Sequence, residues 1–153
     1  MARSATVVAT AVAAALLASF ASLAVARAAA HFRPQPIARA ADGHYWATAQ
    51  VEGRPVRVLV DTGATAVALT AADARALGIA PERLDYSRRL ATASGAVRAA
   101  PVTLSTVEVG GARVEQVSAL VVDGGLGASL LGMSFLDRLS GFSADRDGLV
   151  LRR

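Results

Sequence analysis

From Gly43 to the C-terminus, short runs of strand-forming residues alternate with turn signals, and this pattern restricts the fold more than any other feature. The predicted strands cover 44–51, 56–60, 66–69, 88–93, 96–104, 107–109 and 112–122. The dipeptides Ser94-Gly95 and Gly110-Gly111 lie between pairs of these runs and predict hairpins. Many short strands with turns between them are typical of an all-β barrel or sandwich. We therefore predict an all-β domain, a small closed or nearly closed barrel.

One or two short helices interrupt the strands. Thr70 is a good N-cap for a helix over 71–77, and Gly78 is a typical residue for its end. A second short helical stretch is predicted from the Leu130-Leu131-Gly132 run to about Leu139. The tail, 142–151, contains a turn at Asp145-Arg146-Asp147-Gly148.

The N-terminal segment, residues 1–30, predicts export. Residues 4–26 form a run of 23 uncharged residues, and at about 1.5 Å per residue a helix of this length could span a bilayer. Small residues before position 30 also suit a signal peptidase site. A cleaved signal peptide and a retained transmembrane anchor both remain open. Residues 31–42, with Pro34 and Pro36, are predicted to be a linker to a domain over 43–153.

Composition argues against several classes of function. The chain has no Cys, which excludes a disulfide framework, a thiolate metal site and a Cys nucleophile. Its net charge of +4 comes from scattered arginines without a basic, aromatic-rich face, so we expect no nucleic-acid partner. His44 and Asp42 lack further ligands at metal-site spacing, and Gly124–Gly127 is not a dinucleotide fingerprint. We expect neither a metal nor a cofactor.

The residues with the clearest chemical meaning are Asp61, Thr62 and Gly63. They directly follow the apolar strand 56–60, which would fix the position of the carboxylate. Glycine allows the backbone N–H to approach that carboxylate, and the Thr62 hydroxyl can bond to neighbouring backbone. Asp61 is therefore a candidate functional carboxylate, and Thr62, Gly63 and Ala64 would support its loop.

Three segments resemble the retroviral-type aspartic peptidases, in particular their bacterial membrane-associated or periplasmic members. Residues 58–65 are similar to the active-site loop of that family, which implies that Asp61 is the catalytic carboxylate. Leu130, Leu131 and Gly132 are similar to its hydrophobic-hydrophobic-Gly element, and residues 91–99 occupy the position of its flap hairpin. The resemblance covers about residues 43–153. It implies a single-lobe acid protease fold, a flap at Ala93, Ser94 and Gly95 that covers the substrate, and a periplasmic location.

The resemblance also implies peptide hydrolysis by two carboxylates that share one proton. The chain contains a single Asp-Thr-Gly, and about 110 residues are too few for two lobes. The second Asp61 would therefore come from a second copy across a two-fold axis. We expect a homodimeric endopeptidase acting on protein or peptide substrates, with the apolar strand 149–151 as a candidate interface strand.

A different class of function remains open at this stage. The same fold could serve as a catalytically silent dimerisation or peptide-binding module. The intact Asp61-Thr62-Gly63 run favours the enzyme.

Overall fold

The computed structural model describes residues 34–92 and 95–153, which belong to one compact unit. The predicted signal peptide or anchor over 1–30 lies outside the described residues. In the part of the chain that is described, no helix is long and apolar enough to cross a membrane. The elements are β1 (Trp46–Val51), β2 (Arg54–Val60), β3 (Val67–Thr70), α2 (Ala71–Ala76), η1 (Pro81–Arg83), β4 (Arg88–Thr92), β5 (Gly95–Val109), β6 (Ala112–Val122), β7 (Ser129–Leu131), α3 (Met133–Leu136), β8 (Gly141–Ala144) and β9 (Leu149–Arg152).

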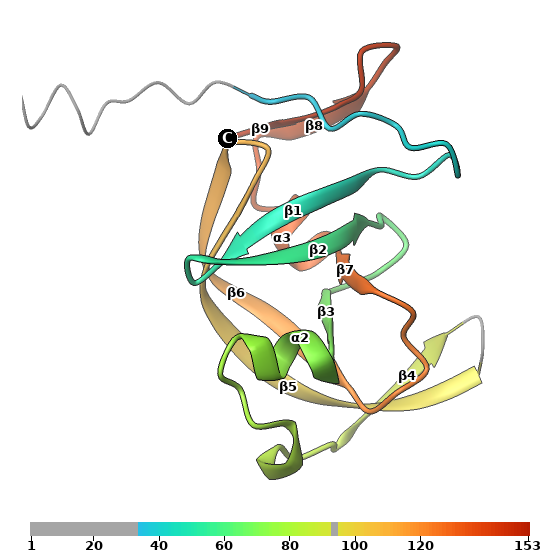
Figure 1. Ribbon diagram of the computed structural model, residues 1–153, viewed down its shortest axis with the longest axis vertical. Coiled ribbons are helices and arrows are strands. Elements are labelled where there is room, and N and C mark those ends of the chain that lie inside the picture. Colours follow the sequence, from blue (N-terminus) through green and yellow to red (C-terminus); the bar gives the residue numbers. More distant parts are fainter. Residues whose placement is uncertain (1–33, 93–94) are drawn as a thin grey trace, which may run out of the picture. The chain divides into compact units, whose positions relative to one another are not determined.

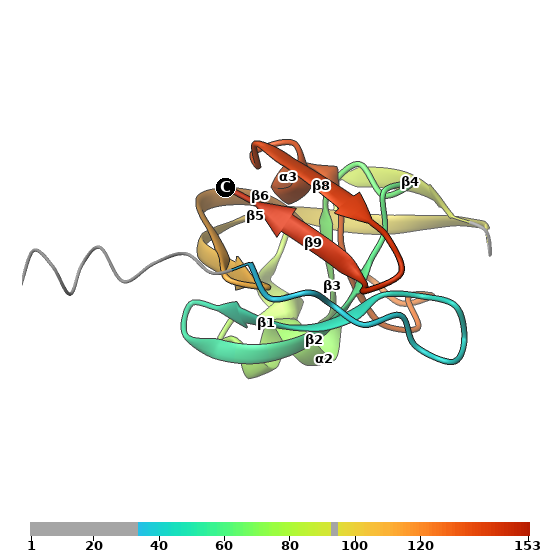
Figure 2. The same ribbon diagram turned by 90° about the horizontal axis from the view of Figure 1, so that it is seen from above.

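Six of these strands form a closed barrel, as predicted. The order in the sheet is β1-β2-β7-β3-β6-β5, and β5 pairs again with β1, which closes the ring. The remaining strand of this sheet, β4, pairs only with β5 among the described strands, and this β4–β5 hairpin extends away from the barrel in both views (Figures 1 and 2). The hairpin between β5 and β6 turns at Gly110 and Gly111, whose φ angles of 56° and 83° favour glycine.

The interior of the barrel holds the main apolar core. It is built from inward-facing residues of the barrel strands together with Phe135 and Leu136 of α3, which are 0% and 1% exposed. A smaller second cluster lies apart from it and consists of Ala68, Ala99 and Val122 with partly buried leucines around them. Because β6 contributes to both clusters, its C-terminal half is apolar on both faces and does not alternate with polar residues.

Two predicted element boundaries were wrong. Residues 95–109 form one strand, whereas the sequence predicted a break after Leu104. The polar pair Ser105-Thr106 suggested that break, but Thr106 stays in the β5–β6 ladder opposite Glu115. Leu130 and Leu131 lie in β7 and not in a helix, since β7 inserts between β2 and β3; the helix begins only at Met133.

The described part of the expected linker is packed against the domain, contrary to the prediction. Ile37 is 8% exposed, and its backbone exchanges two hydrogen bonds with Leu149 of β9, of 2.8 and 2.9 Å. The strand around 149–151 is not the exposed apolar edge that was assumed for it, and its role at a dimer interface stays a prediction. Leu149 and Leu151 belong to the core, and β9 has β8 on one side and Ile37 on the other. The two prolines suggested a linker, and the sequence pattern did not indicate that Ile37 packs against the domain.

Helix α2 begins as predicted, and its start is tied to the barrel. The Thr70 hydroxyl accepts a hydrogen bond from the Asp73 N–H at 3.1 Å, the expected N-cap contact. Ser129, which is 0% exposed, donates to the Asp73 carboxylate and accepts from the Thr70 N–H at 3.0 Å. The sequence did not indicate this role for Ser129. These bonds connect α2 to β7, the strand that leads to Gly132.

Candidate active site

Asp61 lies where two parallel strands end side by side. In the ladder between β2 and β7, Val60 pairs with Leu131, so Asp61 and Gly132 follow neighbouring strand ends. The Asp61 N–H donates a hydrogen bond of 3.1 Å to the Leu131 carbonyl. The structure therefore brings together the two segments that the resemblance singled out, although about 70 residues separate them in the sequence.

The loop 61–66 holds the Asp61 carboxylate by backbone contacts. The Gly63 N–H donates to Asp61 Oδ1 at 2.8 Å, and the Ala64 N–H donates to the Asp61 carbonyl at 3.2 Å. Asp61 is half-buried, whereas Thr62 and Gly63 are exposed. A Cβ on residue 63 would lie 3.1 Å from Asp61 Oδ1, so glycine is the residue that lets this N–H approach without crowding.

Gly132 packs directly on the far side of that loop. A Cβ added there would overlap the Ala66 carbonyl oxygen and lie 2.7 Å from the Ala64 carbonyl oxygen. The first amides of α3 complete the contact: Met133 donates to the Ala64 carbonyl at 2.8 Å, and Ser134 donates to the Thr65 carbonyl at 3.1 Å. The loop is thus clamped by main-chain groups, which depends on the absence of a side chain at 132.

Ser134 adds a side-chain contact that the sequence did not reveal. Its hydroxyl donates to the Ser118 carbonyl at 2.7 Å and accepts from the Val67 N–H at 2.9 Å. It therefore bridges β6 and the start of β3, immediately after the loop. A serine two residues after the hydrophobic-hydrophobic-Gly element was visible in the sequence, but nothing in its spacing indicated these partners.

A cleft of about 700 Å³ opens beside Asp61. Its walls are mostly small and apolar, and they include most of the second apolar cluster. The lining residues are Asp61, Gly63, Ala64, Thr65, Ala66, Ala68, Arg89, Leu90, Ala91, Leu120, Val122, Gly125, Leu126 and Leu130. Among these described residues, Asp61 is the one acidic side chain and Arg89 the one basic side chain. The cleft thus places a single carboxylate against an apolar surface that could hold peptide side chains.

The β4–β5 hairpin forms one side of this cleft. Thr92 pairs with Gly95, which confirms the predicted hairpin, and Arg89, Leu90 and Ala91 line the cleft from β4. Of the predicted flap residues, Gly95 begins β5, while Ala93 and Ser94 lie outside the described residues. Leu130 lines the cleft, and Leu131 is buried at 0% exposure in the core.

Asp42 and His44 have a structural role in a turn. The His44 backbone N–H and the Trp46 indole N–H both donate to the Asp42 carboxylate, at 2.9 and 2.8 Å, and these bonds lower the pKa of Asp42. The Arg57 guanidinium lies 4.7 Å from the Trp46 ring centre and covers its face. Within the described ranges, no group of three His, Asp or Glu side chains is placed to hold a metal ion.

The part of the chain that forms the barrel, the Asp61 loop and the Gly132 contact matches a known protein family. The family described as "gag-polyprotein putative aspartyl protease" matches residues 47–138, from β1 to the end of α3. The chain belongs to this family. The match includes both the Asp61 loop and the Gly132 element that packs on it.

Solved structures agree with the family assignment. The retropepsin-like aspartic protease from Rickettsia conorii is 43% identical, with a TM-score of 0.67, over 75% of this chain and 94% of that chain. The EIAV protease in complex with the inhibitor HBY-793 is 23% identical, with a TM-score of 0.54, over 66% of this chain and 92% of that one. The second likeness supports the fold alone.

The curated relatives are longer than the matched region. An uncharacterized protein of Rickettsia prowazekii (strain Madrid E) is 43% identical over 115 residues, which cover 75% of this chain and 49% of that protein. The chain spans about half the length of the curated relatives it matches.

Proposed function

We propose that this family member is an aspartic endopeptidase whose active site is completed by a second copy of the chain. The observation that carries this proposal is the placement of Asp61. Asp61 is half-buried and lines an apolar cleft, on a loop held by main-chain hydrogen bonds with both β7 and α3. A catalytic group needs such a fixed position relative to its substrate.

The proposed chemistry uses two copies of Asp61 in different protonation states. The ionised carboxylate accepts a proton from a water molecule, and the water oxygen attacks the scissile carbonyl carbon. The protonated carboxyl donates its proton to the carbonyl oxygen. As the tetrahedral intermediate collapses, the proton taken from water passes from the first carboxyl to the amide nitrogen and the C–N bond breaks. A hydroxyl proton of the intermediate returns to the other carboxylate, which releases the amine and the new carboxylic acid. The apolar cleft residues would bind substrate side chains and exclude water.

The requirement for a second copy follows from the charged groups of the cleft. Acid and base roles need two carboxyl groups close together, and the described lining of the cleft contains only Asp61. A two-fold axis next to the exposed Thr62 would bring the two loops together and supply the missing group.

Activity is expected to fall more steeply than protein concentration on dilution. Well below the dissociation constant of the dimer, a tenfold dilution should lower the total rate about a hundredfold, because dimer concentration follows the square of monomer concentration. Progress curves over a dilution series, matched to sedimentation equilibrium at the same concentrations, measure this. A sedimenting monomer with full specific activity would contradict the shared site.

The pH–rate profile should be bell-shaped, with its maximum on the acid side of neutral. Catalysis requires one proton shared by the pair, so activity is lost both when this proton leaves and when a second one binds. A hydroxyl at the position after Gly63 could donate a hydrogen bond to the carboxylate and favour its ionised form, but Ala64 offers none. We therefore expect the active range to reach mildly acidic pH and not to be confined to strong acid. Measuring kcat/KM on one peptide from about pH 3 to 8 tests this. A rate that still rises at the upper end of this range would indicate a different nucleophile.

We also propose that the domain works outside the cytoplasm, either released or held at the inner membrane facing the periplasm. The support is the uncharged N-terminal run over 4–26 with small residues before position 30. Fractionation of cells that express the full chain, with N-terminal sequencing of the mature protein, would distinguish an anchored from a processed form. Recovery of the unprocessed chain in the cytosolic fraction would contradict both.

A further inference from the structure

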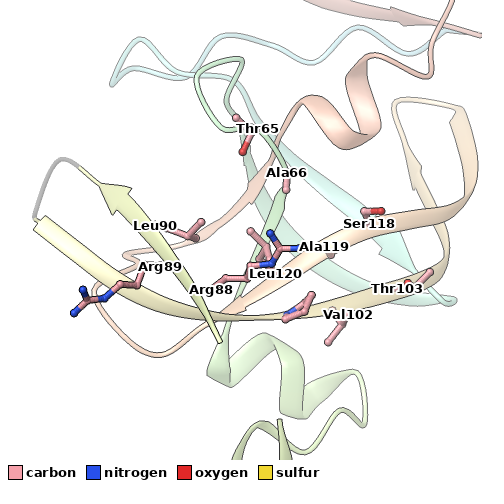
Figure 3. Close-up of a pocket in the computed structure, with 11 residues that line it drawn as sticks. Thr65, Ala66, Arg88, Arg89, Leu90, Val102, Thr103, Ser118, Ala119 and Leu120 are labelled. Atoms are coloured by element: carbon pink, nitrogen blue, oxygen red, sulfur yellow. The ribbon is translucent and has the colours of Figure 1, made fainter. Parts of the chain in front are cut away.

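A second cavity of about 530 Å³ continues from the Asp61 cleft. The two share the lining residues Thr65, Ala66, Arg89, Leu90 and Leu120. An extended peptide in the first cleft can therefore pass directly into the second, where a side chain further from the scissile bond would lie. Figure 3 shows this second cavity between β4, the loop at Thr65 and the strands β5 and β6.

The described residues that line this second cavity include basic side chains and no acidic group. Its floor is formed by Val102, Ala119 and Leu120, and hydroxyl groups are present on three further residues, Thr65, Thr103 and Ser118. Arg88 and Arg89 of β4 are its only charged members, within the residues that the structure describes. A carboxylate placed here would meet positive charge and hydroxyl donors but no like charge.

Arg88 is the arginine that is directed into the cavity. Figure 3 shows its guanidinium extending from β4 toward Ala119 and Leu120, while that of Arg89 points away. Across residues 34–92 and 95–153, neither arginine has an ion-pair or hydrogen-bond partner for its guanidinium. By contrast, Arg98, on the neighbouring strand β5, is paired with Asp123 at 2.7 Å. Among the described residues, the Arg88 charge thus lies over an apolar floor with no counter-ion.

We propose that this second cavity binds an acidic side chain of the peptide substrate and that Arg88 is its specificity-determining residue. This inference rests on the proposed peptidase function. An arginine fork can bind a Glu or Asp carboxylate through two parallel hydrogen bonds, and the methylene groups of a Glu side chain suit the apolar floor. In a symmetric dimer the cavity occurs at both ends of the cleft, so acidic residues are recognised on either side of the scissile bond.

Paired peptides that differ only by Glu or Gln test this directly. The pair is varied at each position two to five residues from the cleaved bond, and kcat/KM is measured for the wild type, Arg88→Gln and Arg83→Gln. At the position that enters the cavity, the wild type should prefer Glu about fivefold, as expected for a solvent-accessible ion pair. Arg88→Gln should bring the ratio to about one. Arg83 is exposed on η1, has no described side-chain partner and lies outside both cavities, so Arg83→Gln should keep the ratio.

Two further measurements separate electrostatic recognition from other effects. Raising the salt concentration should reduce the Glu preference of the wild type, because salt screens accessible charges. Arg88→Glu should reverse the preference toward a peptide with Lys at the same position. Circular dichroism and thermal unfolding confirm that each variant is folded, and binding of the Glu and Gln peptides to Asp61→Asn by fluorescence anisotropy gives a readout that does not need catalysis.

The outcomes distinguish this inference from the function on which it rests. Cleavage with equal rates for Glu and Gln peptides at every position would overturn the role of Arg88 and leave the peptidase intact. If folded Arg88→Gln kept the wild-type ratio of kcat/KM for the Glu and Gln peptides, the role of Arg88 would likewise be overturned and the peptidase left intact. Absence of cleavage with every peptide would count against the peptidase, while a Glu preference in binding that Arg88→Gln removes would still support the acidic site.

Discussion

Replacing Asp61 by Asn is expected to lower kcat/KM by about 1000-fold or more while the protein stays folded. The amide can neither accept the proton of the attacking water nor donate as a carboxylic acid, and general acid–base catalysis is commonly worth about 100- to 10,000-fold. Asparagine keeps an Oδ1 acceptor for the Gly63 N–H, the 2.8 Å bond that shapes the loop. Cleavage of a fluorogenic peptide and the urea unfolding midpoint should both be measured on the same preparation.

The matched control for this variant is Asp137→Asn. Asp137 lies at the C-terminal end of α3, is exposed and lines neither cavity, so the same loss of one charge should leave activity nearly unchanged. If Asp61→Asn kept activity within tenfold of the parent, the carboxylate would not be the catalytic group. The domain would then fit the alternative function as a binding or dimerisation module.

The second large effect is expected on stability, from Gly132→Ala. The new methyl group would overlap the Ala66 carbonyl oxygen and lie 2.7 Å from that of Ala64, and both are main-chain atoms that cannot rotate away. Overpacking typically costs about 1 to 3 kcal/mol, and a clash with fixed backbone belongs at or above the upper end, so we expect a loss of about 3 kcal/mol or more in the free energy of unfolding. Activity should fall as well, because the displaced loop carries Asp61.

Gly127→Ala provides the comparison for that experiment. Gly127 is exposed in the loop before β7, and a methyl group added there would meet no neighbouring atom within 4 Å. The same chemical change at this position should alter the free energy of unfolding by less than about 0.5 kcal/mol. Urea denaturation of both variants and the parent gives the two differences. Equal midpoints for Gly132→Ala and Gly127→Ala would show that the loop does not need the close contact.

Local sequence patterns predicted the barrel and the neighbourhood of Asp61 well. Strand alternation, the Gly110-Gly111 turn and the Thr70 cap each depend on residues near in sequence, and the structure confirms them. Asp61 and Gly132 could be placed together only through the resemblance, since their contact results from the pairing of β2 with β7. The residue pattern of either strand taken alone does not predict that β2 and β7 pair.

The features that the sequence missed depend on tertiary contacts of single side chains. Ile37 is the one large apolar side chain in the proline-containing stretch 34–42, and only its contact with β9 reveals its burial. Ser134 and Ser129 have no distinctive spacing, yet each bridges two separate elements through one hydroxyl. The proposed role of Arg88 in substrate specificity depends on the residues that line the cavity around its guanidinium. Strand periodicity does not predict these neighbours.

The clamp between the Asp61 loop and the Gly132 element also has a consequence for biosynthesis. Three of the main-chain hydrogen bonds that hold the loop are made with residues 131–134, about 70 positions later in the chain. Such long-range contacts form late, because a large loop must close before any of them is made. A ribosome-bound chain that ends before β7 therefore has Asp61 but no ordered site around it. For the proposed peptidase, the active site would thus form only after most of the domain has been synthesised, which would protect the nascent chain from cleavage by its own copies.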